Sequence, residues 1–211
     1  MRAFIYVGGD IRIDAIEEFP TEEDLVIAAD SGYKNALALG VSPTVVLGDF
    51  DSLEESTLPE DVKKIEFPPK KDSTDTQLAV EYAIEQKCDQ IILIGGLSGR
   101  LDHTLSNLAI LEDLSSRNLR GLITDGFNRA RFLRNDSAIL PRSKYFQYLS
   151  LLTADEKIRG VEIDGCKYPL KNAKLHRNTQ YAVSNEITGN CAFVAIRRGG
   201  AWIVESDEAK K

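Results

Sequence analysis

The N-terminal part of this chain alternates short β-rich runs with helix-like segments, and this order most limits the folds open to it. The helix-like segments are clearest at Asp75–Gln86 and Leu105–Leu114, where apolar residues recur at spacings of three and four. Elements that alternate in this way form a mostly parallel sheet with helices on both faces. The expected strands are Ala3–Val7, Leu25–Ala29, Thr44–Leu47, Gln90–Ile94 and Gly121–Thr124.

The pattern changes near Asn128, after which no helix-like segment follows. Short alternating runs succeed one another, separated by turn residues such as Asn135-Asp136 and Gly199-Gly200. Strands in such an order favour a small antiparallel sandwich or barrel. We therefore expect an α/β domain over residues 1–128 and an all-β domain over residues 129–211. The strands expected in the second domain are Ala130–Leu133, Ser137–Leu140, Phe146–Leu152, Ile158–Ile163, Gln180–Val183, Cys191–Arg197 and Ala201–Glu205.

Charge and cysteine content exclude several classes of protein. The formal net charge of −7 disfavours a nucleic-acid partner, because such partners require a basic surface. The longest apolar runs, such as Ile91–Ile94, are too short to cross a membrane. Cys88, Cys166 and Cys191 show no CxxC spacing, which fits a reducing compartment and argues against a disulfide framework or a zinc site. We expect a cytoplasmic protein that binds neither nucleic acid nor membrane.

Glycine and aspartate follow several of the expected strands. In open parallel sheets, ligands bind at the carboxyl ends of the strands. Glycine lets a ligand approach the backbone closely, and aspartate offers oxygen atoms to a hard cation. We therefore expect these strand ends to converge on one site. The segments are Gly8-Gly9-Asp10, Asp30-Ser31-Gly32, Gly48-Asp49-Phe50-Asp51-Ser52 and Gly95-Gly96.

Asp49 and Asp51 are candidate magnesium ligands. They lie two positions apart, so in an extended backbone their side chains point the same way. Mg²⁺ prefers one or two protein carboxylates, with water and substrate phosphates as its other ligands. The alternative is an Asx-turn after the strand, because aspartate and serine are also common turn residues.

The segment from Lys70 to Gln77 leads into the first clear helix. Capping of the helix accounts for one of its polar residues, since the free N–H groups of a first turn need acceptors. The hydroxyls of Ser73 and Thr74, together with these N–H groups, also make a phosphate site. Asp72 and Asp75 add ligands for a metal or a hydroxyl group.

A second strand-to-helix turn, Gly95–Thr104, combines glycines with a guanidinium and a carboxylate. The glycines admit a phosphate, and Arg100 can bind two of its oxygens. Asp102 can bind metal, accept a proton, or simply cap the helix. For His103, a packed or surface position is favoured over a direct chemical role. The segment matches neither the GxxxxGK[ST] loop nor the GxGxxG fingerprint.

Taken in order, these motifs resemble the thiamine pyrophosphokinase family. The likeness continues in the second half of the chain and spans nearly all of it. The segments that carry it are Asp30-Ser31-Gly32, Gly48-Asp49-Phe50-Asp51-Ser52, Asp72-Ser73-Thr74-Asp75, Gly95 to His103, Lys167-Tyr168-Pro169-Leu170 and Ser184-Asn185-Glu186.

The resemblance implies an α/β domain that binds ATP and Mg²⁺, and a β-sandwich that binds thiamine and mediates a homodimer with sites at the subunit interface. It implies transfer of the pyrophosphoryl group of ATP to the hydroxyl of thiamine, giving thiamine diphosphate and AMP. By motif, the resemblance implies that the metal ligands are Asp49, Asp51, Asp75 and Asp102, and that the catalytic residues are Asp75, Asp102 and Arg100. It implies that the nucleotide-binding residues are Asp30, Ser31, Gly32, Asp72, Ser73, Thr74, Gly96, Arg100 and His103, and that the thiamine-binding residues are Ser184, Asn185 and Gln77.

Two questions remain open at this point. Either Asp75 or Asp102 can accept the proton of the attacking hydroxyl. The alternatives to this function are a related ATP-dependent transferase that acts on another heterocyclic alcohol, and a nucleotide-binding regulator without turnover. A purely structural module leaves the clustered aspartates unexplained, because like charges repel without a cation.

Overall fold

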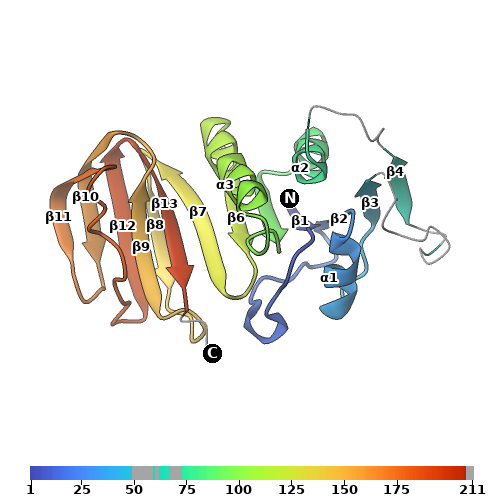
Figure 1. Cartoon of the computed structure of the whole chain (residues 1–211), viewed down its shortest axis with the longest axis horizontal. Coiled ribbons are helices and arrows are strands. Elements are labelled where there is room, and N and C mark those ends of the chain that lie inside the picture. The colour runs from blue at the N-terminus through green and yellow to red at the C-terminus, as the bar shows by residue number, and fades with distance from the viewer. Residues whose placement is uncertain (49–58, 60–61, 67–72, 208–211) are drawn as a thin grey trace. The chain divides into compact units, whose positions relative to one another are not determined.

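The computed structural model describes residues 1–48, 59, 62–66 and 73–207 (Figure 1). The chain divides into two compact units. The first comprises Met1–Leu114 and Asn118–Gly126, and the second comprises Ser115–Arg117 and Phe127–Lys211. Each unit is described separately below.

The first unit contains a parallel sheet in the order β4-β3-β2-β1-β5-β6. Its central strands are rich in buried β-branched and leucine side chains, as expected for strands covered on both faces. The sheet confirms the predicted α/β class, but β4 was not predicted. The strands are β1 (Arg2–Tyr6), β2 (Leu25–Ala29), β3 (Val45–Gly48), β4 (Lys63–Glu66), β5 (Gln90–Ile94) and β6 (Arg120–Thr124).

Helices cover this sheet, with α1 on one side and α2 and α3 on the other (Figure 1). On the α1 side, Phe4 and Tyr6 of β1 pack with Ile94 and Ala36. The predicted helices α2 and α3 are present, whereas the short α1 was not predicted. None of the helices in the described part of the chain combines the length and apolarity that a bilayer crossing requires. Their bounds are η1 (Ile13–Ala15, a 3-10 turn), α1 (Gly32–Ala38), α2 (Asp75–Glu85) and α3 (Leu101–Ser116).

The second unit is a sandwich of two antiparallel sheets, as predicted. One sheet has the order β7-β13-β9 and the other, 4-stranded, has the order β11-β10-β12-β8. Leucine, isoleucine and valine side chains from both sheets form one core cluster. The strands are β7 (Asn128–Arg134), β8 (Ser137–Pro141), β9 (Tyr148–Thr153), β10 (Lys157–Asp164), β11 (Leu170–His176), β12 (Cys191–Arg198) and β13 (Gly200–Ser206).

The strand predicted at Gln180–Val183 is wrong. The segment runs past β9 with isolated contacts: Leu151 N donates to Ala182 O at 2.7 Å, and Gln180 bonds to Thr153. Ala182 packs against the core cluster, which explains the apolar pattern. The strand lies instead at Leu170–His176, where most side chains are exposed and the alternation is weak.

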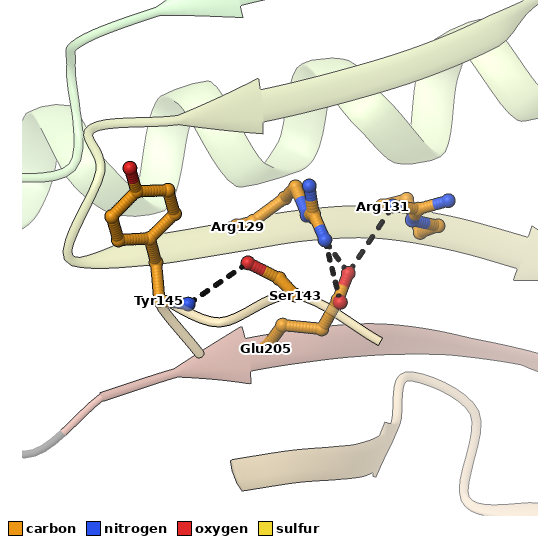
Figure 2. Close-up of polar contacts among 5 residues, drawn as sticks. All are labelled: Arg129, Arg131, Ser143, Tyr145 and Glu205. Atoms are coloured by element: carbon orange, nitrogen blue, oxygen red, sulfur yellow. Dashed lines mark hydrogen bonds and ion pairs between the residues drawn. The ribbon is translucent and has the colours of Figure 1, made fainter. Parts of the chain in front are cut away.

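A buried ion cluster joins β7 to β13. Arg129 and Glu205 are directly opposite each other in the sheet, and Arg129 Nη2 lies 2.8 Å from Glu205 Oε1. Figure 2 shows Glu205 in contact with Arg131 as well, at 3.2 Å. The Arg129 guanidinium also stacks over Phe146, with 4.7 Å to the ring centroid. These contacts satisfy charges that would be costly to bury alone.

Candidate active site

The carboxyl ends of β1, β2 and β5 open onto a cavity of about 410 Å³ in the first unit. Backbone from all three strand ends lines it, together with the first turns of α2 and α3. This is the edge of a parallel sheet where ligands bind. The lining residues are Val7, Gly8, Gly9, Ala29, Asp30, Ser31, Thr74, Asp75, Thr76, Gly96, Ser98, Arg100, His103 and Asn107.

A smaller cavity of about 200 Å³ adjoins the first. It is lined by Asp102 and Ser106 and by residues that also line the larger cavity, among them Thr74, His103 and Asn107. The first turns of α2 and α3 therefore border both spaces. The Thr74 hydroxyl, the His103 imidazole and the Asn107 amide, the last from the second turn of α3, give this part of the site a polar wall.

The turn after β2 places Asp30 and Ser31 at the larger cavity. Asp30 has a positive φ of 46°, and its backbone N donates to Leu47 O at 2.8 Å. Gly32 begins α1 directly against β1, where an added Cβ would lie 2.0 Å from Tyr6 O. Only glycine allows this approach.

The turn after β5 contacts the turn after β1. Gly96 N donates to Gly8 O at 3.0 Å, and Asp10 N donates to Ser98 Oγ at 2.7 Å. Gly96 has a positive φ of 77°, which glycine adopts without strain. The two glycine-rich segments therefore form one wall of the larger cavity.

Two asparagines that the sequence analysis missed also hold these turns. Asn35 Nδ2 donates to Val7 O at 2.8 Å and to Gly9 O at 2.9 Å. Asn107 Nδ2 donates to Gly96 O at 2.9 Å. A helical spacing could have pointed to Asn107, since it follows His103 by one helical turn and so lies on the same face of α3.

Arg100 and Asp102 form a two-point ion pair at the start of α3. Arg100 Nε lies 3.1 Å from Asp102 Oδ1, and Arg100 Nη2 lies 2.6 Å from Asp102 Oδ2. The Arg100 hydrogen bond lowers the pKa of Asp102, and His103 N adds a further donor to the same carboxylate. Arg100 lines the larger cavity and Asp102 the smaller one.

At the start of α2, Thr74 and Gln77 form a capping box. Gln77 N donates to Thr74 Oγ1 at 3.2 Å, and Thr74 N donates to Gln77 Oε1 at 3.0 Å. These bonds satisfy donors of the first turn and fix the entry to the helix. Asp75 follows in the first turn and lines the larger cavity, while Ser73 is exposed.

Three of the predicted site residues, Asp49, Asp51 and Asp72, lie outside the described residues. Within residues 1–48, 59, 62–66 and 73–207, no group of three or more His, Cys, Asp or Glu side chains is placed to hold a metal ion. The described cavity offers oxygen donors from Asp30, Asp75 and neighbouring hydroxyls.

Ser184 and Asn185 belong to the second unit. Asn185 is buried and binds the backbone of Tyr168 with both ends of its amide: Oδ1 accepts from Tyr168 N at 2.9 Å, and Nδ2 donates to Tyr168 O at 2.8 Å. Ser184 has a positive φ of 55° and is exposed. Asn185 thus fixes the exposed segment that contains Ser184.

In chemical terms, the first unit offers a cavity suited to an anion. Glycine-rich backbone lines one wall, and the Arg100 guanidinium lies at its border. Carboxylates at the same cavity suit a cation bound together with that anion. A metal-bound polyphosphate meets both requirements.

Comparisons with known proteins agree with this description. Residues 16–123 match the family model "Thiamin pyrophosphokinase, catalytic domain", and residues 137–199 match "Thiamin pyrophosphokinase, vitamin B1 binding domain". Thiamine pyrophosphokinase of Bacillus subtilis (strain 168) is 26% identical over 97% of this chain and 98% of its own length.

Solved structures of the same name share the fold. The crystal structure of thiamine pyrophosphokinase from Bacillus subtilis has a TM-score of 0.85 and 25% identity, covering 99% of this chain and 100% of that one. The structure of the protein from Geobacillus thermodenitrificans has a TM-score of 0.85 and 25% identity, covering 100% of this chain and 99% of that one. This chain therefore belongs to the thiamine pyrophosphokinase family.

Proposed function

We propose that this protein transfers the pyrophosphoryl group of ATP to the hydroxyl of thiamine, giving thiamine diphosphate and AMP. The observation that carries the proposal is the glycine-walled cavity at the strand ends, bordered by Arg100 and Asp75, in a chain of this family. The glycine turns and Arg100 suit the phosphates of ATP.

In the proposed reaction, the hydroxyl oxygen of thiamine forms a bond to the β-phosphorus of ATP. The bond from that phosphorus to the α,β-bridging oxygen breaks, and its electron pair leaves with AMP. Such transfers gain mainly from alignment and from neutralised charge. Arg100 supplies positive charge, while the turns that contain Gly8 and Gly96 fix the position of the phosphates.

The hydroxyl proton passes to a carboxylate, and we propose Asp75 for this role. The alternative, Asp102, is paired with Arg100, which lowers its pKa and makes it a weaker proton acceptor. Asp75 lines the larger cavity together with Arg100.

The donor set fits Mg²⁺, because the described cavity presents carboxylate and hydroxyl oxygens, the ligands that this cation prefers. We propose Asp49 and Asp51 as its ligands, with Asp102 contributing, since Asp75 accepts the proton in our proposal. When bound, the ion neutralises polyphosphate charge. Asp51→Asn should lower turnover strongly while leaving the thermal unfolding midpoint nearly unchanged, and equal losses of both would indicate a structural turn.

The nucleotide-binding role extends in our proposal to Asp30, Ser31, Gly32, Asp72, Ser73, Thr74, Gly96 and His103. For thiamine we propose Ser184, Asn185 and Gln77. Residues 1–128 would bind ATP, and residues 129–211 would bind thiamine and mediate a cytoplasmic homodimer with sites at the subunit interface.

The test is to incubate the purified protein with ATP, thiamine and Mg²⁺ and to measure AMP and thiamine diphosphate together. Equal amounts of both products are expected. Release of AMP with a different heterocyclic alcohol as the acceptor would identify a related transferase. Binding of ATP without AMP release would identify a nucleotide-binding regulator and refute the proposal.

A further inference from the structure

The carbonyl oxygens of the turn after β1 are all engaged in hydrogen bonds. Gly8 O accepts from Gly96 N at 3.0 Å. Val7 O and Gly9 O both accept from the side-chain amide of Asn35, at 2.8 and 2.9 Å. A single side chain on α1 therefore fixes two carbonyl groups beside the cavity.

The turn after β5 is held in the same manner by α3. Asn107 is 6% exposed, and its Nδ2 donates to Gly96 O at 2.9 Å. A Cβ at position 96 would lie 2.6 Å from that nitrogen, so the glycine is needed for the contact. Asn107 lines both cavities.

In the turn after β1, the carbonyl groups are hydrogen-bonded but two backbone N–H groups are not. Within the described part of the chain, the backbone N–H groups of Gly8 and Gly9 have no hydrogen-bond partner, and both residues line the larger cavity. Successive N–H groups in a turn attract anions, whereas carbonyl oxygens repel them. The bonds from Asn35 and Asn107 thus engage carbonyl oxygens that would repel an anion. The N–H groups of Gly8 and Gly9, which attract an anion, stay available.

We propose that Asn35 and Asn107 are positioning residues for the polyphosphate of the nucleotide. They hold the carbonyl groups of Val7, Gly9 and Gly96, so that the turn after β1 offers the N–H dipoles of Gly8 and Gly9 to the phosphates. This inference rests on the proposed function, which supplies a nucleoside triphosphate as the ligand.

The decisive variant is Asn35→Asp, which keeps the size of the side chain but replaces the donor nitrogen with an oxygen. Two carbonyl groups lose their donor, and a negative charge is added near the phosphates. Because the turn loses two bonds that orient its N–H groups towards the phosphates, we expect binding of ATP to weaken about 10- to 100-fold. Calorimetry with ATP and Mg²⁺ measures this dissociation constant. In turnover assays, the KM for ATP should rise by the same factor, whereas the KM for thiamine should stay the same.

The matched control is Gln180→Glu, the same amide-to-acid change in the second unit. Gln180 bonds to the backbone of Thr153, accepting from N at 3.2 Å and donating to O at 3.4 Å. The Gln180→Glu variant should lower stability without changing the dissociation constant for ATP.

Asn107→Asp should weaken ATP binding as Asn35→Asp does. If Asn35→Asp does not fold, Asn35→Ala is used in its place, because it removes both donated bonds without adding charge.

Folded Asn35 and Asn107 variants that bind ATP as tightly as the unchanged protein would overturn the inference, even if thiamine diphosphate is formed. A protein that makes no thiamine diphosphate but loses ATP affinity in these variants would support the inference while refuting the proposed reaction. An unchanged protein that does not bind ATP would refute both.

Discussion

Arg100 and Asp102 lie two positions apart at the start of α3 and are joined by hydrogen bonds of 3.1 and 2.6 Å, although both side chains are largely exposed. In this arrangement the guanidinium is oriented by the carboxylate. The orientation of the Arg100 guanidinium at the border of the cavity is therefore set by a residue only two positions away in the chain.

The pair makes a prediction about acid titration. The pKa of Asp102 should lie below the ordinary value of 3.8, and Arg100→Gln should return it towards that value. Carbon NMR of the side-chain carboxyl group over a pH series measures both. An unchanged pKa in Arg100→Gln would show that the pair does not persist in solution.

Asp24 should make stability depend on pH. The hydrogen bond from Arg2 lowers its pKa from 3.8 to about 2, with Thr21 as a further donor. A depressed pKa stabilises the folded state above the unfolded pKa, and this stabilisation is lost as the pH falls from about 4 through about 2. Asp24→Asn should cost about 1–2 kcal/mol at pH 7 and almost nothing near pH 2, measured by urea denaturation. A cost that is independent of pH would contradict the ion pair as its source.

Tyr6→Phe should leave the protein as stable or stabilise it by up to about 1 kcal/mol. The Tyr6 hydroxyl is buried without a hydrogen-bond partner among the described residues, and burial raises its pKa to about 12. Removing an unsatisfied polar group removes its desolvation cost. Urea denaturation gives the free energy of unfolding. A clear loss of stability would instead reveal a bound water molecule at the hydroxyl.

Gly32→Ala should destabilise the first unit by about 3 kcal/mol or more, because the new methyl group would overlap the backbone of β1. The added Cβ would lie 2.0 Å from Tyr6 O and 2.4 Å from Tyr6 C. Gly189→Ala is the control, since its nearest neighbour would lie at 3.7 Å. Thermal unfolding of both variants should show a large drop only for the first.

Glu205→Gln should cost about 3–5 kcal/mol, the usual effect of removing one partner of a buried ion pair. The carboxylate contacts both Arg129 and Arg131 (Figure 2). Glu186→Gln, which removes an exposed pair with Lys167, should cost less than about 1 kcal/mol. Similar costs for the two variants, measured by urea denaturation, would show that burial does not strengthen the inner pair.

The elements with a strong apolar pattern were predictable from sequence, and those without one were not. Leu25–Ala29 and Gln90–Ile94 were placed correctly because continuous apolar runs mark buried parallel strands. Strand β4 has an almost wholly exposed pattern and carries no such signal. Helix α1 has seven residues and buries few side chains, so it is too short to show a helical pattern of apolar residues.

Site residues with a local sequence pattern were likewise predictable, and those without one were not. The glycine and aspartate residues after β1, β2 and β5 were visible because these residue types recur at successive strand ends, and four of them, Gly8, Gly9, Asp30 and Gly96, line one cavity. Asn35 was missed, since an amide that bonds to a distant carbonyl leaves no local pattern. Asn107 was also missed, although its position one helical turn after His103 offered a signal. Their partners become neighbours only when the sheet has formed.

The bond from Asp10 N to Ser98 Oγ, 2.7 Å long, spans 88 positions of sequence. The turn after β1 therefore cannot form this bond until the turn after β5 has folded beside it. During synthesis, a ribosome that has released only the strands up to β4 exposes a fragment without the second half of the glycine wall. Nucleotide should consequently protect the emerging chain from proteolysis only after residue 98 has left the exit tunnel.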